Sequence, residues 1–221
     1  MELKNKKINF LGDSITEGHG TSGNGYRFVD LVKEMAELAE ARNYGIGGTR
    51  IAPQQKPEHQ SFEDDFIRRA GRMDPDADVI VVFGGTNDFG HGDAPFGCFE
   101  DRTTDTFSGA IHVLYRTLIE RFPEAEIVVI TPLHRGNEDN LLGDGWNKTE
   151  GVEYGPLKKY VDRIRETAEY YSLPVLDLWR MGKLQTRTDV IREKYMPDGL
   201  HPNDAGHRIL AERICAFLRG L

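Results

Sequence analysis

The stretch FLGDSITEG, Phe10 to Gly18, joins an apolar segment to a small polar cluster. Residues Ile8–Leu11 have the length and composition of a strand that is buried on both faces. Gly12 permits a tight turn after this strand, so Ser14 is expected just beyond its C-terminal end. In a parallel sheet, this is the edge at which ligands bind. The stretch therefore predicts both a buried first strand and a functional hydroxyl at its end.

Further apolar runs of strand length recur along the chain, at Arg42–Ile46, Val79–Phe83, Ile127–Ile130 and Val175–Leu178. Between them lie apolar stripes with helical spacing, within Phe28–Leu38, Ile111–Phe122, Tyr160–Tyr171 and Ala205–Leu218. Strands that alternate with helices indicate a parallel sheet with helices on both faces. The chain of 221 residues has no internal repeat or linker, which predicts a single domain over residues 1–221.

Composition and charge exclude several classes of partner. The net charge is -8 and no long cluster of Lys and Arg is present, so we expect no nucleic-acid partner. No stretch approaches the roughly 20 apolar residues of a membrane helix, and no apolar run of signal-peptide length follows the basic N-terminus. We therefore expect no membrane partner and a cytoplasmic location. The two cysteines, Cys98 and Cys215, have neither metal-ligand nor disulfide-framework spacing.

The two ends of the chain carry a candidate nucleophile and a candidate base. Ser14 would lie beside backbone N–H groups, as an activated nucleophile does, although a helix cap or a phosphate-binding turn would also place a serine there. In PDGLHPNDAGH, Pro197 to His207, Asp198 and His201 are three residues apart. This spacing lets the carboxylate reach one imidazole nitrogen while the other faces a hydroxyl. Alternatively, both are turn residues in a solvated loop.

Two further loops carry candidate oxyanion donors. In NYGIGGTRI, Asn43 to Ile51, the Gly47–Gly48 pair lets the backbone approach a ligand, although glycine pairs also serve ordinary turns. In VVFGGTNDFG, Asn87 offers an amide donor, or else forms a local turn with Asp88. Each loop follows a predicted strand, so both would lie at the sheet edge that holds Ser14.

These four segments resemble the motifs of the SGNH hydrolase superfamily, the GDSL-like lipases and acylhydrolases. The matching blocks are Gly12–Ser14, Asn43–Gly48, Gly85–Asp88 and Asp198–His201, with Ile15 in place of the leucine of GDSL. The resemblance implies a Ser14 nucleophile, a His201 base oriented by Asp198, and an oxyanion hole of the Ser14 N–H, the Gly48 N–H and the Asn87 side chain. It also implies a flavodoxin-like, three-layer α/β/α sandwich on a five-stranded parallel sheet, with no cofactor or metal.

Two other functions use the same residue types. A metal-dependent phosphoesterase could draw on Asp13, Asn87, Asp88, His134 and His201, but their spacing forms no compact ligand motif. A nucleotide-binding flavodoxin-like module could use the glycine-rich strand ends, but it leaves the pairing of Asp198 with His201 unexplained.

The substrate is predicted from the long loops Asp88–Thr106 and Pro132–Tyr154, which are mostly polar, charged and glycine residues. A long acyl chain needs a continuous apolar channel, so we expect short acyl groups, such as acetyl, on a small polar or carbohydrate alcohol. A lysophospholipase or thioesterase of the same superfamily is the alternative. The residues expected to contact substrate are Asp88, His91, His134 and Trp146, with Arg135 beside them; Trp146 could instead hold its own loop in place.

Overall fold

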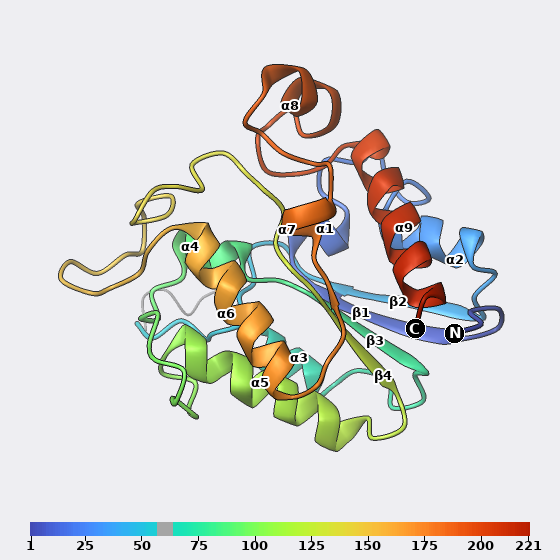
Figure 1. Ribbon diagram of the computed structural model, residues 1–221, viewed down its shortest axis with the longest axis horizontal. Coiled ribbons are helices and arrows are strands. Elements are labelled where there is room, and N and C mark those ends of the chain that lie inside the picture. Colours follow the sequence, from blue (N-terminus) through green and yellow to red (C-terminus); the bar gives the residue numbers. More distant parts are fainter. Residues whose placement is uncertain (57–63) are drawn as a thin grey trace.

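Five parallel strands form one sheet in the order β2-β1-β3-β4-β5 (Figure 1). The computed structural model describes residues 1–56 and 64–221. The strands are β1 (Lys7–Gly12), β2 (Glu40–Gly45), β3 (Val79–Phe83), β4 (Glu126–Ile130) and β5 (Val175–Leu176). This strand order is the flavodoxin-like one. The strand that follows β1 in the chain, β2, lies on one side of β1, whereas β3, β4 and β5 lie on the other side. In sheets of this kind, ligands bind where the order switches, at the carboxyl ends of the strands.

Helices cover both faces of the sheet, which confirms the predicted three-layer sandwich (Figure 1). One face carries α2 (Phe28–Met35) and α9 (Asp204–Arg219), and the other carries α3 (Phe66–Ala70), α5 (Phe107–Arg121) and α6 (Leu157–Tyr170). Successive strand residues point to opposite faces, so Phe10 packs with the first layer and Leu11 with the second. The central strands β1, β3 and β4 are therefore buried on both sides, whereas every residue of the edge strand β2 is only partly buried.

Four short helices lie beyond the main layers: α1 (Ser14–Glu17), α4 (Thr86–His91), α7 (Leu178–Met181) and α8 (Asp189–Tyr195). The first two follow β1 and β3 almost directly. Gly12 pairs in register with Gly45 of β2 and Phe83 of β3, so the strands end level with one another. The residues that follow these strands are thus brought to one edge of the sheet. None of the helices in the described part of the chain is long and apolar enough to cross a membrane.

The structure differs from the predicted elements at several places, and the short helices α3, α7 and α8 were not predicted. The last strand ends at Leu176 rather than at Leu178, because the Asp177 side chain accepts a hydrogen bond from the Arg180 N–H and caps α7. Ile46 lies one residue beyond β2. The segment predicted as a loop from Asp88 starts within α4.

Candidate active site

A chain of hydrogen bonds joins Ser14, His201 and Asp198. The Ser14 Oγ atom lies 2.9 Å from His201 Nε2, and His201 Nδ1 lies 2.7 Å from Asp198 Oδ2. Ser14 opens α1, and the other two residues lie on the segment that leads into α9. The fold thus brings the two ends of the sequence together at the carboxyl edge of the sheet.

The Asp198 carboxylate is held by its own loop. Its Oδ1 atom accepts hydrogen bonds from the N–H groups of Leu200, at 2.8 Å, and of His201, at 2.7 Å. Burial alone would raise the pKa of Asp198, but hydrogen bonds from the ring and backbone of His201 outweigh it and hold this pKa below its ordinary value. The carboxylate is therefore ionised at neutral pH and fixes the orientation of the imidazole.

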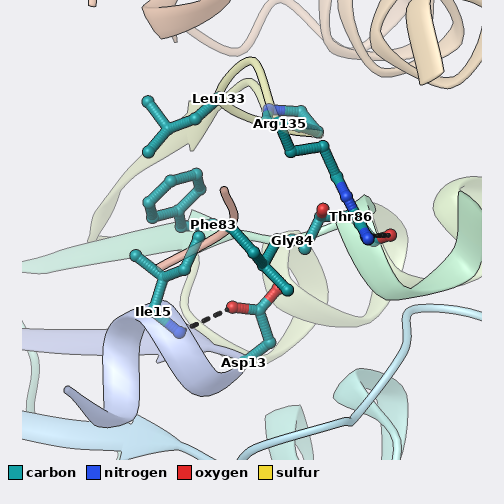
Figure 2. A pocket seen from close by; sticks show the side chains of 9 residues that line it. Asp13, Ile15, Phe83, Gly84, Thr86, Leu133 and Arg135 are labelled. Atoms are coloured by element: carbon teal, nitrogen blue, oxygen red, sulfur yellow. Dashed lines mark hydrogen bonds between the residues drawn. The ribbon is translucent and has the colours of Figure 1, made fainter. Parts of the chain in front are cut away.

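Asp13 determines how the chain turns into α1. Its Oδ1 atom accepts a hydrogen bond of 3.0 Å from the Ile15 N–H, which makes Asp13 the N-cap of this helix (Figure 2). Gly12 is required just before it, because a Cβ atom there would lie 1.9 Å from Thr16 Oγ1. Asp13 is 2% exposed, and burial raises its pKa to about 7. The local sequence therefore presents Ser14 at a fixed position beside the strand end.

A narrow pocket lies beside this turn (Figure 2). Figure 2 shows the Asp13 carboxyl, the Phe83 ring and the Leu133 side chain around it. The pocket extends to Leu200, which precedes His201, and is too narrow to admit a water molecule. Its walls come in part from the loop after β4 and from the loop that carries His201.

The loop after β2 presents the Gly48 N–H beside α1. Gly48 has a φ of +73°, and a Cβ atom there would meet no atom within 4 Å. Its N–H donates to no acceptor among the described residues. The preceding Gly47 N–H donates to Glu17 Oε2 of α1 at 2.7 Å, and Asn43 Nδ2 donates to the Thr16 carbonyl at 2.7 Å. These bonds attach the loop to the helix that starts at Ser14.

Asn87 and Asp88, the first residues after the N-terminus of α4, hold the same loop from the other side. Asn87 Nδ2 donates to the Thr49 carbonyl at 2.9 Å, which uses one of its two N–H bonds and leaves the other. The Asp88 carboxylate accepts from the Ile51 N–H at 3.0 Å and the Ala52 N–H at 2.8 Å. Asp88 is 3% exposed, and burial raises its pKa although these bonds oppose the rise.

Two of the aromatic residues predicted to contact substrate, His91 and Trp146, stack on each other. Their ring centroids are 4.3 Å apart with an interplanar angle of 12°. Trp146 is exposed, whereas His91 is buried and lies 3.3 Å from Arg50 Nη1 through its Nδ1 atom. Burial lowers the pKa of His91 to about 4, so the ring is neutral at pH 7. Arg50 Nη1 also donates to the Gly48 carbonyl at 2.8 Å, which connects the stacked pair to the Gly48 loop.

His134 and Arg135 lie on the loop after β4 and are engaged by other residues. The His134 ring packs on Trp179 with centroids 3.8 Å apart, and its Nδ1 atom lies 3.0 Å from both carboxylate oxygens of Glu138. Arg135 pairs with Asp144 at 2.7 Å. These contacts shape the loop from within.

The same loop touches the segment that carries Asp198 and His201. The Gly136 N–H donates to the Gly199 carbonyl at 2.7 Å.

The residues of the metal-site hypothesis are not gathered at one point. Asp13, Asp88 and His134 are bonded to separate partners, and within residues 1–56 and 64–221 no three His, Cys, Asp or Glu side chains are arranged to hold a metal ion.

Sequence reasoning missed Glu17 and Arg50. Glu17 lies four residues after Asp13 in the first motif, and Arg50 follows the glycine pair. Their proximity in sequence to these motifs was the available signal. Their contacts with the Gly48 loop, by contrast, depend on the fold.

The chain is similar in sequence and fold to several known proteins. The sequence profile of the GDSL-like lipase/acylhydrolase family matches residues 10–209. A GDSL lipase of Mycobacterium tuberculosis is 26% identical over 99% of this chain and 84% of its own length. A crystal structure of a protein from Lactobacillus plantarum is 28% identical, with a TM-score of 0.82 over 99% of this chain and 98% of that one. The lipase/acylhydrolase from Enterococcus faecalis has the same fold, with a TM-score of 0.66, 23% identity and coverage of 97% and 96%.

Proposed function

We propose that Ser14, His201 and Asp198 form the catalytic triad of this chain, which belongs to the GDSL-like lipase/acylhydrolase family of serine ester hydrolases. The observation that carries this proposal is the unbroken path of hydrogen bonds from Ser14 Oγ through the imidazole to the Asp198 carboxylate. A serine hydroxyl is a weak nucleophile until an adjacent base accepts its proton. The Nε2 atom of His201 is within hydrogen-bond distance of that proton.

The first step forms an acyl-enzyme. Ser14 Oγ attacks the ester carbonyl carbon while its proton passes to His201 Nε2. The carbonyl oxygen becomes an oxyanion, which accepts hydrogen bonds from the Ser14 N–H, the Gly48 N–H and the second N–H of Asn87. The C–O bond to the alcohol then breaks, and the alcohol leaves with the proton from His201.

The second step releases the acid. A water molecule gives a proton to His201 Nε2 and attacks the acyl carbon, and the bond to Ser14 Oγ breaks as the hydroxyl regains a proton. Asp198 holds the Nδ1–H of the imidazole throughout and stabilises the charged ring that forms in each step. Apart from the ester and the water molecule, both proposed steps use groups of this chain.

We further propose that the substrate is an acetyl or other short acyl ester of a small polar or carbohydrate alcohol. The polar composition of the loops at residues 88–106 and 132–154 supports this choice. The exposed face of Trp146 is available to stack on a sugar ring, while His91 supports the opposite face. Asp88 and His134 then act by shaping the loops rather than by touching the substrate.

A specific observation favours the alternative, a lipase-like substrate. Leu141, Leu142 and Trp146 are exposed on one loop, with 64%, 49% and 55% of their surface accessible. Exposed apolar side chains that are close in sequence can contact an acyl chain or a lipid surface. The length of the preferred acyl group separates the two substrates.

The test combines a nucleophile variant with an ester series. Ser14→Ala should lose hydrolysis of p-nitrophenyl acetate and labelling by a fluorophosphonate probe, while Ser22→Ala, a change at an exposed serine, should keep both. A folded Ser14→Ala protein with wild-type turnover would disprove the triad. For the wild type, kcat/KM should be highest for acetate or butyrate. A maximum at eight carbons or more would favour the lipase-like substrate and leave the triad proposal intact.

A further inference from the structure

The Arg69 side chain is a buried cation that binds three separate segments of the site. It is 4% exposed and belongs to α3. Its Nη1 atom donates to the Gly12 carbonyl at 2.8 Å and to the Tyr44 carbonyl, and its Nη2 atom donates to Thr49 Oγ1 at 2.6 Å. A guanidinium can serve acceptors in several directions because its donors form a rigid planar fork.

The side chain is itself fixed in place. Its Nε atom donates to the Asp64 carbonyl at 2.7 Å, and its guanidinium lies 4.7 Å from the centre of the Phe66 ring. Burial lowers the pKa of Arg69 to about 10, and the acidic groups of Asp64 and Asp13 oppose this drop. The guanidinium is therefore charged at neutral pH, and its hydrogen bonds are of the stronger, charge-assisted kind.

Two acceptors of Arg69, Gly12 and Thr49, lie close in sequence to proposed oxyanion donors. Gly12 is two residues before Ser14, and Thr49 directly follows Gly48. The Thr49 carbonyl also accepts the hydrogen bond from Asn87 Nδ2. The three proposed oxyanion donors come from three different segments of the chain, those of Ser14, Gly48 and Asn87. Arg69 binds the Ser14 segment at Gly12 and the Gly48 segment at Thr49. It reaches the Asn87 segment indirectly, because Asn87 donates to the Thr49 carbonyl.

We propose that Arg69 is a positioning residue that sets the spacing of the three oxyanion donors. The inference rests on the proposed function, because it assumes that an oxyanion forms at Ser14. Preorganised donors stabilise the transition state only when they are correctly placed, and a displacement of about 1 Å can cost about 10²-fold in rate. A structural role alone would change stability without a selective effect on kcat.

The first test is Arg69→Lys, which keeps the charge but cannot bind all three acceptors. We expect kcat for p-nitrophenyl acetate to fall by about 10- to 100-fold and KM to change by less than about threefold, measured below the melting temperature of the variant. Arg72→Ala is the matched control, since Arg72 is exposed and pairs with Asp64 only at the surface. It should retain wild-type kcat.

The second test is a double-mutant cycle with Asn87→Ala. If Arg69 acts through the oxyanion donors, Arg69→Lys should lower kcat several-fold less in the Asn87→Ala background than in the wild type. If Arg69→Lys does not fold, Thr49→Val serves instead. It removes one of the acceptors of Arg69, the Thr49 hydroxyl, and keeps a similar side-chain volume, and we expect kcat to fall about 10-fold.

Two results would overturn the proposal for Arg69: wild-type kcat in the folded variants, or equal losses in both backgrounds of the cycle. Either would leave the triad untouched as long as Ser14→Ala is inactive. Activity that survives in Ser14→Ala would instead overturn the proposed function itself.

Discussion

The Nε2 atom of His201 lies 2.9 Å from the Oγ atom of Ser14, although the two residues are 187 positions apart in the chain. The first residues after β1 and the last residues before α9 thus form one site. All of the chemistry proposed for this protein depends on that contact.

Asp198→Ala should lower kcat by about 10²-fold or more, because general-base catalysis by a well-oriented imidazole contributes roughly 10²–10⁴-fold. The variant loses the bond to His201 Nδ1 and both backbone bonds that shape the loop. Steady-state kinetics with p-nitrophenyl acetate measures the loss, and His201→Ala should show a larger one. Equal activity in Asp198→Ala and the wild type would show that the carboxylate does not orient the base.

Asn87→Ala should lower kcat by roughly 10²–10³-fold with little change in KM, the usual effect of removing one oxyanion donor. The side chain already donates one N–H to Thr49, so its amide is oriented before substrate binds. Full progress curves at several substrate concentrations separate the two constants. If KM rises while kcat is unchanged, Asn87 binds the ground-state substrate and is not an oxyanion donor.

Asp13→Asn should change how stability depends on pH. Burial raises the pKa of Asp13 from 3.8 to about 7. At a pH between these two pKa values, Asp13 is deprotonated in the unfolded chain but protonated in the folded chain. The contribution of this group therefore makes the wild type less stable as pH rises from about 4 to about 7. The asparagine variant lacks this titration and retains an acceptor for the Ile15 N–H.

The measurement for Asp13 is urea unfolding of both proteins from pH 4 to pH 8. The free energy of unfolding of Asp13→Asn minus that of the wild type should increase by up to about 4 kcal/mol between pH 4 and pH 7 and then stay constant. Titrations common to both proteins cancel in this difference. A difference that does not depend on pH would contradict a raised pKa at Asp13.

Trp146→Ala should raise KM for acetylated sugars several-fold and leave the kinetics of p-nitrophenyl acetate within about twofold, because stacking on a sugar ring contributes only to binding of the alcohol. Leu142→Ala is the control on the same loop, since Leu142 is also exposed. If the two variants raise KM for acetylated sugars equally, the effect belongs to the loop as a whole rather than to the indole ring.

The sequence was sufficient to predict the sheet and the placement of Ser14 at its carboxyl edge, whereas the pairing of Asp198 with His201 was inferred from their spacing and from the family resemblance. Buried parallel strands are continuous apolar runs, and the residues after them must meet at the carboxyl edge. The predicted last strand is too long because Leu178 continues the apolar run. The strand ends earlier in the structure because the Asp177 side chain forms a local hydrogen bond that caps the next helix.

Arg69 shows why the side-chain contacts that depend on the fold could not be predicted from the sequence. The residue lies in the segment FIRRA, where neighbouring arginines look alike in sequence. Its acceptor Gly12 is 57 positions away, and only the packing of α3 at the strand ends turns one arginine inward while Arg68 remains half exposed. The stacking of His91 on Trp146 likewise joins the end of α4 to a distant loop, and no sequence pattern connects the two.

The bond from the Gly136 N–H to the Gly199 carbonyl bears on how this enzyme could be re-engineered. The loop after β4 is the natural place to exchange segments between relatives in order to change substrate preference. Its backbone is hydrogen-bonded to Gly199, which lies next to Asp198. A grafted loop of different length would therefore also shift the segment that holds Asp198 and His201. Grafts that begin after Glu138 keep this attachment, and they can vary the distal half of the loop around Trp146 while the acid–base pair stays in register with Ser14.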